Sequence, residues 1–190
     1  ILTKGTLILR DLDRLAYAAQ VMDVSTAFSI GTLDEDVWRK SEPGTPHPRK
    51  RVAAVQKLNE AGIPCGVLIA PVLPGLSDGK HQLREVVTAC IDAGATHVSP
   101  ILLHLRPKVR EVYMEWLAET YPELVPRYEQ MYTRAYASSA DKKALSAMVA
   151  EIASEHPRPR PLQRRPRRNE PPKEMHRDIA ALKNEQMSLL

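Results

Sequence analysis

Apolar runs and stretches with helical spacing alternate along the chain from Ile1 to Leu103. Val24–Ile30 alternates and carries Val, Thr, Phe and Ile, which predicts a strand. Ile63–Ala70 is almost continuously apolar between two prolines, as expected of a strand covered on both faces, and His97–Leu103 is a second candidate of this kind. Ile1–Lys4 is predicted to be the end of a strand whose beginning lies upstream.

Helical patterns separate these strands. Asp11 is a candidate N-cap for a helix with Leu12, Leu15, Ala16 and Ala19 at helical spacing. A short helix over Glu35–Lys40 is predicted, with Thr32 or Asp34 as its cap. Two amphipathic helices follow, and each ends at a glycine that permits a left-handed stop: Arg49–Ala61 before Gly62, and His81–Ala93 before Gly94.

Three connecting segments have their own signals. Thr6–Leu9 is a short apolar run that fits either an extended piece or a bend. Residues 42–48 contain too much proline for regular structure, and Leu73–Asp78 is predicted as a loop that ends in an N-cap.

Strand and helix alternating at this spacing predict an α/β fold with right-handed crossovers and a parallel sheet. The sheet is either doubly wound or curled into part of a barrel, and periodicity does not choose between them. After Arg106 only helices are predicted, over Lys108–Thr120, Glu123–Tyr136 and about Asp141–Glu155.

Charge divides the chain unevenly. Between His156 and Arg177, eight basic against two acidic side chains give a local charge of +6, which leaves −2 for the rest of a chain whose total is +4. This Pro- and Arg-rich segment lacks the apolar residues that offset ordering entropy, so it is predicted to be largely disordered. It either binds nucleic acid through phosphate contacts or serves as a solubilising extension. Met175–Leu190 is predicted to form a short amphipathic helix.

The two cysteines, Cys65 and Cys90, lie far apart in apolar segments. We interpret them as free buried thiols of a cytoplasmic protein, and no metal site is predicted from them. The chain has neither a long apolar stretch nor a secretory signal, so no membrane contact is expected. It begins without Met, which suggests that it starts inside a longer protein.

Five blocks then carry a resemblance: Thr3-Lys4, Phe28-Ser29-Ile30, Glu42-Pro43-Gly44-Thr45, Ala61-Gly62-Ile63-Pro64 and Gly66-Val67-Leu68-Ile69-Ala70-Pro71. Their order and spacing resemble the radical S-adenosylmethionine (SAM) family, and within it the spore photoproduct lyase group. The resemblance runs from Ile1 to about Tyr136.

The resemblance implies a partial (βα) barrel with SAM and an iron–sulfur (4Fe-4S) cluster at the carboxyl ends of the strands. The family's CxxxCxxC loop follows its first strand and would precede Ile1. We therefore expect residues 1–137 to be the C-terminal part of a radical SAM barrel truncated at its N-terminus, followed by a helix over 138–155 and the basic tail over 156–190. Without the three thiolates, this chain alone is expected to be inactive.

Four residues are cofactor candidates by this resemblance. It implies that Lys4 contacts the SAM carboxylate, that Ser29 contacts SAM through its hydroxyl, and that the backbone at Ala70 and Pro71 lies near the adenine. The alternatives are a solvated lysine, a serine satisfied by a neighbouring carbonyl, and a tight turn after the strand.

Four more residues are candidates for the substrate side, and no catalytic residue is predicted. Glu42 and Thr45 either line the substrate or belong to a rigid turn before the following helix. His104 and Arg106 end the last strand, where barrels carry functional loops, and Arg106 suits a phosphate or a carboxylate. Surface or core-edge roles are the alternative for both.

Three hypotheses for function follow. The chain belongs to an enzyme that cleaves SAM to make a 5′-deoxyadenosyl radical, with DNA repair as the analogy. Alternatively, it binds nucleic acid through its basic tail, or it is a fragment with no independent function. The substrate itself is not predicted.

Overall fold

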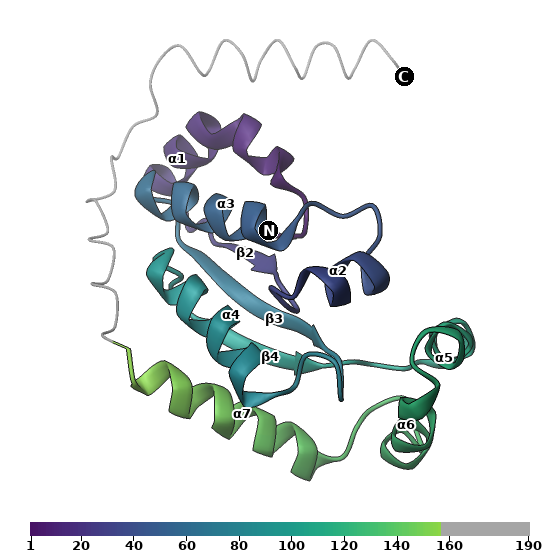
Figure 1. The fold of residues 1–190 in the computed structure, drawn as a ribbon. Helices are drawn as coiled ribbons and strands as arrows, with labels where there is room; N and C mark the ends of the chain where they lie inside the picture. Colours follow the sequence, from purple (N-terminus) through teal and green to yellow (C-terminus); the bar gives the residue numbers. More distant parts are fainter. Residues whose placement is uncertain (157–190) are drawn as a thin grey trace, which may run out of the picture.

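A four-stranded parallel sheet forms the centre of the computed structural model, which describes residues 1–156 (Figure 1). The strands are β1 (Leu2–Thr3), β2 (Thr26–Ser29), β3 (Cys65–Val72) and β4 (Val98–Leu102), and their order in the sheet is their order in the chain. Apart from His156, the basic tail predicted over 156–190 and the helix predicted over Met175–Leu190 lie outside the described residues.

Helices connect the strands in the way that a barrel requires. The chain passes through η1 (Thr6–Asp11) and α1 (Leu12–Val21), then α2 (Glu35–Ser41) and α3 (Pro48–Glu60), then α4 (Lys80–Asp92). When strand order follows chain order, right-handed crossovers place every helix on one face. The sheet therefore has the topology of one side of a (βα) barrel rather than that of a doubly wound sheet.

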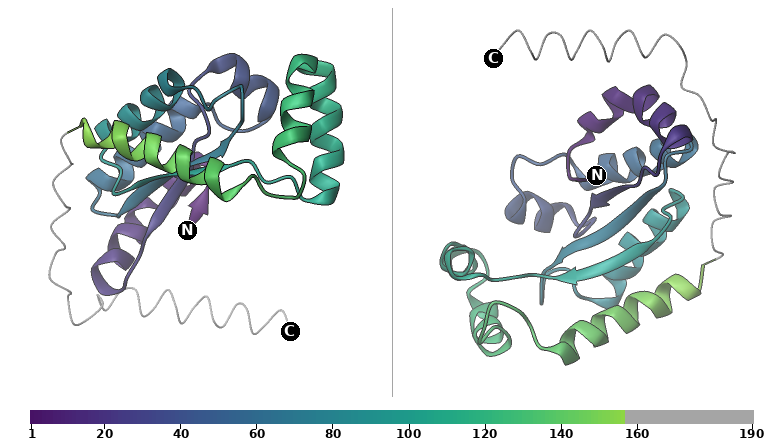
Figure 2. Two further views of the ribbon diagram at one scale, coloured as in Figure 1. Left: turned by 90° about the horizontal axis from the view of Figure 1, so that it is seen from below. Right: turned by 180° about the vertical axis from the view of Figure 1, so that it is seen from behind.

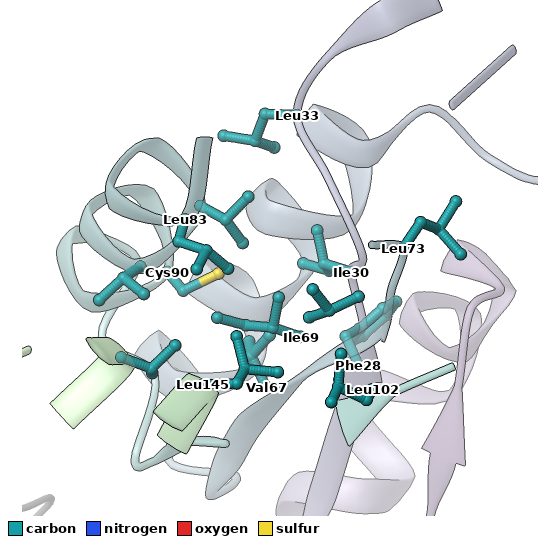
Figure 3. Close-up of a cluster of buried hydrophobic side chains, with 14 of the residues drawn as sticks. Phe28, Ile30, Leu33, Val67, Ile69, Leu73, Leu83, Cys90, Leu102 and Leu145 are labelled. Carbon is teal, nitrogen blue, oxygen red and sulfur yellow. The ribbon is translucent and has the colours of Figure 1, made fainter. Parts of the chain in front are cut away.

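The main core lies between the sheet and these helices (Figure 3). Phe28 and Ile30 of β2 and its extension, and Val67 and Ile69 of β3, are fully buried. They pack with helix residues that include Leu83, Cys90 and Leu145. Because side chains alternate along a strand, the residues between them face the opposite, inner side of the sheet.

The remaining helices follow β4. α5 (Pro107–Thr120), η2 (Pro122–Leu124) and α6 (Val125–Met131) form a hairpin beyond the carboxyl ends of the strands (Figure 2). α7 (Ser139–Ser154) then returns and lies beside α4 and β4. Leu145, Val149 and Ile152 belong to the same buried cluster as the sheet, so α7 is part of one structural unit with the preceding residues.

Most predicted elements are confirmed, with bounds shifted by no more than two residues. Gly62 and Gly94 have φ of 79° and 75°, which is the left-handed conformation expected where α3 and α4 stop. Asp34 is the cap of α2, because its carboxylate accepts the Val37 N–H at 2.9 Å.

Four local predictions are wrong. Thr6–Leu9 is neither extended nor a simple bend, because it belongs to the 3₁₀ helix η1. Gly79 rather than Asp78 precedes α4 as its N-cap, since the Asp78 carboxylate instead accepts from Gly75 N and Arg127.

The last two corrections concern ends of elements. The helix predicted over Glu123–Tyr136 ends at Met131, because Tyr136 pairs with His104 in an antiparallel bridge. Ser29, which lies inside the strand predicted over Val24–Ile30, is instead the last residue of β2. In the described part of the chain, no helix is long and apolar enough to cross a membrane.

Candidate functional site

The register of the sheet places Lys4 beside Ser29. Thr3 of β1 pairs with Phe28 of β2. Lys4 directly follows Thr3, and Ser29 directly follows Phe28. Phe28 faces the helices, so alternation directs Ser29 to the inner side of the sheet at its carboxyl edge. The two residues predicted to contact SAM thus lie at the carboxyl ends of two neighbouring parallel strands.

Ser29 is tied to the neighbouring strand. Its hydroxyl donates to the carbonyl oxygen of Ala70 at 2.6 Å, and Ser29 is 8% exposed. The chain after Ser29 also lies close to β3, since a Cβ on Gly31 would be 2.6 Å from the Pro71 carbonyl oxygen. Ser29, Ala70 and Pro71 therefore meet, and the Ser29 oxygen keeps its lone pairs for accepting a hydrogen bond.

Lys4 is held by a carboxylate from the Pro-rich loop. The Lys4 ammonium pairs with Oε1 of Glu42, and Oε2 of the same carboxylate lies 2.8 Å from Nη2 of Arg51. The Lys4 side chain is 38% exposed, whereas that of Glu42 is 12% and that of Arg51 is 0% exposed. One carboxylate thus joins an accessible cation to a buried one.

Arg51 is the most buried polar residue of the site, and all three nitrogens of its guanidinium donate hydrogen bonds. Nε donates to the Pro46 carbonyl at 2.7 Å and Nη1 to the Ser29 carbonyl at 3.0 Å. Nη2 donates to Glu42 and, at 2.6 Å, to Oγ1 of Thr45. A buried guanidinium needs such partners, because an unpaired charge in the interior is costly.

Thr45 completes the turn between α2 and α3. Its Oγ1 donates to the Glu42 carbonyl at 2.7 Å and accepts from Nε1 of Trp38 at 3.0 Å. The next cap is His47, whose ring nitrogen accepts the Arg49 N–H at the start of α3. The loop is therefore a rigid turn that presents the Glu42 carboxylate.

The resulting cluster is Lys4, Glu42, Thr45 and Arg51, and we call it the Lys4 cluster. Two cations and one anion give it a net charge of +1. The ammonium has three N–H donors, of which Glu42 takes one. The cluster can therefore accept a carboxylate or a phosphate at the edge of the sheet.

Sequence reasoning missed Arg51. The signal was available, because Arg51, Val55 and Leu58 follow the i, i+4, i+7 spacing of the buried face of α3. An arginine on an otherwise apolar helix face, close in sequence to a glutamate, indicates a buried ion pair.

His104 and Arg106 lie in a second cluster after β4. The His104 ring meets that of Tyr136 edge-on, with centroids 4.7 Å apart, and Nη2 of Arg106 lies 3.4 Å from the Tyr136 hydroxyl. All three residues are exposed. We call them the Tyr136 cluster, and within residues 1–156 no hydrogen bond or ion pair joins them to the Lys4 cluster.

The cysteines lie away from both clusters, in the core between sheet and helices. Cys65 and Cys90 are fully buried, and burial raises the pKa of Cys90 to about 12 and also raises the pKa of Cys65. Both thiols therefore stay protonated near neutral pH and do not suit a metal or cluster ligand. Residues 1–156 hold no group of three or more His, Cys, Asp or Glu side chains that could bind a metal ion.

Comparison with other proteins first gives sequence relatives. Uncharacterized protein Rv2578c of Mycobacterium tuberculosis is 42% identical over 157 residues, which cover 82% of this chain and 46% of that protein. Uncharacterized protein MJ0683 of Methanocaldococcus jannaschii is 25% identical over 153 residues, which cover 80% of this chain and 51% of that protein. The chain thus spans about half the length of these relatives. No protein-family model matches it.

Solved structures give the fold. A cysteine-to-serine mutant of spore photoproduct lyase matches with a TM-score of 0.57 at 18% identity, over 81% of this chain and 47% of the lyase. A double mutant of the same enzyme, with bound AdoMet and dinucleoside spore photoproduct, matches with a TM-score of 0.59 at 20% identity over the same shares. The described part of the chain therefore has the fold of one side of a radical SAM-like barrel.

Proposed function

We propose that this chain forms the SAM-binding side of a radical SAM enzyme. The observation that carries the proposal is the position of Lys4 beside Ser29 at the carboxyl edge of a parallel sheet. Ligands of open and closed α/β sheets bind at this edge. The fold shared with a lyase structure that holds AdoMet supports the same ligand class.

The residues present fit the amino-acid end of SAM. Lys4 would hold the carboxylate, because its ammonium is accessible and has donors beyond the one that Glu42 uses. The Ser29 hydroxyl would accept a hydrogen bond from the ligand, because its own O–H already donates to the Ala70 carbonyl. The backbone at Ala70 and Pro71 borders the same edge and would flank the rest of the ligand.

The residues do not fit an iron–sulfur cluster. The chain has two cysteines, and both are buried on the helix side of the sheet. This chain therefore supplies no thiolate ligands for a cluster. SAM bound here would give the 5′-deoxyadenosyl radical and methionine on one-electron reduction by a donor that this chain does not supply, and the part of these residues would be to bind and orient the molecule.

The Tyr136 cluster supports a substrate side that is separate from the cofactor. Arg106 has donors beyond its bond to Tyr136, and the Tyr136 ring is 44% exposed. An accessible guanidinium next to an accessible ring suits a ligand with an anionic group and a flat ring, such as a nucleotide. We favour a substrate that contains nucleosides, because one of the lyase structures holds a dinucleoside spore photoproduct.

Isothermal titration calorimetry of the whole chain with SAM tests the proposal. We expect saturable binding that weakens by about tenfold or more in Lys4→Met, because a charge-assisted hydrogen bond is lost. Lys57→Met, which removes an exposed lysine on α3, is the matched control and should leave the affinity unchanged. Absence of SAM binding, or equal affinity in Lys4→Met, would contradict the proposal.

A further inference from the structure

Glu42 differs from the other polar residues of the site in being fixed on one side and holding an accessible group on the other. Its Oε2 is bound to Arg51, which is fully buried and donates to four acceptors. Its Oε1 is bound to Lys4, whose side chain is 38% exposed. Arg51 therefore fixes Glu42, and Glu42 in turn limits the position of the Lys4 ammonium.

The same guanidinium also reaches the second candidate residue. Nη1 of Arg51 donates to the carbonyl of Ser29, the last residue of β2. One buried side chain therefore connects the backbone of Ser29 to the carboxylate that holds Lys4. The distance between these two ligand-facing residues is set by a hydrogen-bonded network rather than by two independent side chains.

A held ammonium binds better than a free one. A lysine on a flexible four-carbon chain loses rotamer freedom when a ligand immobilises it, and this loss weakens binding. Glu42 removes that freedom beforehand, and the buried Arg51 leaves the cluster with a net positive charge despite the carboxylate. The geometry is thus prepared for an incoming carboxylate without neutralising its attraction.

We propose that Glu42, anchored by Arg51, is a positioning residue that holds the Lys4 ammonium for the carboxylate of SAM. This inference rests on the proposed function. The alternative is a competitive role, in which the Glu42 carboxylate would occupy the Lys4 ammonium and hinder binding of the ligand. The two roles predict opposite changes in affinity when the carboxylate is removed.

The experiment compares two ligands in Glu42→Gln, with calorimetry on the whole chain. SAM carries the carboxylate, whereas 5′-methylthioadenosine keeps the adenosine and lacks the amino-acid part. We expect the affinity for SAM to fall by about tenfold, as for other residues that orient a ligand-binding group, while the affinity for methylthioadenosine stays within about twofold. A purely structural role would weaken both ligands equally.

The matched control is Glu35→Gln, which removes an exposed carboxylate that pairs with Arg39 on α2. It should change neither affinity. Thermal unfolding reports whether Glu42→Gln folds, since it removes the counter-ion of a buried arginine. Glu42→Asp keeps that charge beside Arg51 while shortening the reach to Lys4, and we expect the same loss for SAM alone.

The outcomes separate the inference from the proposed function. If Lys4→Met weakens SAM but both Glu42 variants bind SAM as tightly as, or more tightly than, the unchanged chain, the positioning role is wrong and the SAM site stands. Equal weakening of both ligands also overturns the positioning role. If the unchanged chain does not bind SAM, the proposed function fails and the inference fails with it.

Discussion

The carboxyl edge of the sheet carries two polar clusters that are built in opposite ways. In the Lys4 cluster, Arg51 is fully buried, and each of its three nitrogens donates a hydrogen bond within the protein. In the Tyr136 cluster, His104, Arg106 and Tyr136 are exposed. Beside the antiparallel bridge between His104 and Tyr136, their side chains meet through a ring contact and a long hydrogen bond. Both clusters follow strands of one sheet, yet only the first is part of the packed interior.

This difference separates two kinds of binding surface. A cluster with a buried, hydrogen-bonded core holds its accessible member in one place, which suits a small ligand of defined shape. An exposed cluster adapts its side chains and suits a larger partner that arrives from solvent. The lyase structures share the fold that carries both clusters.

The largest expected effect is in the Lys4 cluster. Arg51→Ala removes a buried charge and leaves Glu42 and three further acceptors without their donor, so the free energy of unfolding should fall by about 3–5 kcal/mol. Chemical denaturation measures this change. Arg49→Ala, at an exposed position one turn or less away on α3, should change stability by no more than about 0.5 kcal/mol. Similar losses in the two variants would remove the contrast between the clusters.

The next effect concerns three tyrosines of α5, of α6 and of the residue after α6, whose rings pack together: Tyr113, Tyr128 and Tyr132. Tyr113→Phe removes the hydrogen bond of 3.0 Å between the Tyr113 and Tyr128 hydroxyls, and leaves that of the fully buried Tyr128 unpaired. The free energy of unfolding should fall by about 1–3 kcal/mol. The hydroxyl of Tyr132 is buried without a partner among the described residues, so Tyr132→Phe should be neutral or slightly stabilising. A loss in Tyr132→Phe as large as in Tyr113→Phe would contradict this assignment.

Alkaline pH should destabilise the fold because it deprotonates a buried thiol and a buried tyrosine hydroxyl. Burial raises the pKa of Cys90 from 9.0 to about 12, and burial also raises the pKa of Tyr113 from 10.0 to about 12. The folded state holds these protons more tightly than the unfolded state. The contribution of the two groups to the free energy of unfolding is therefore complete below pH 9 and is lost as the pH rises toward 12. Each group lowers the free energy of unfolding by up to about 1.4 kcal/mol per pH unit in its window.

Denaturation from pH 8 to pH 11 checks this slope. Cys90→Ala should flatten it from pH 9 upward, and Tyr113→Phe should flatten it from pH 10 upward. A slope that neither variant alters would show that other groups cause the alkaline loss.

The smallest expected effect is in the Tyr136 cluster. Arg106→Ala removes an exposed guanidinium whose hydrogen bond to Tyr136 is 3.4 Å long, so stability should change by no more than about 0.5 kcal/mol. The same variant should weaken binding of a single-stranded oligonucleotide if the cluster faces such a substrate, and fluorescence anisotropy at low salt measures this. A large loss of stability would mean that the cluster is structural.

Much of the fold was predictable because its signals are local. Apolar runs such as Ile63–Ala70 and glycines such as Gly62 report the burial and the backbone conformation of their own segment. Two local predictions were wrong because the residues concerned contact distant partners. Asp78 looks like an N-cap from its neighbours, but Arg127 lies close enough in space to bind its carboxylate instead. The helix predicted as far as Tyr136 stops early, because Tyr136 pairs with His104 across the fold.

The sequence by itself determined the order of strands and helices and predicted the parallel sheet, because hydrophobic spacing and turn residues act over a few positions. The candidate cofactor residues at the carboxyl ends of the strands came from the resemblance to a known family. Only the tertiary structure decided that Lys4 is held by Glu42, which lies 38 residues later, and that Arg51 supports both Glu42 and the end of β2. These contacts depend on the register between β1 and β2 and on the return of α3 to the edge of the sheet. No local pattern encodes that meeting, since the free energy of a buried ion pair depends on partners that only the packed fold brings together.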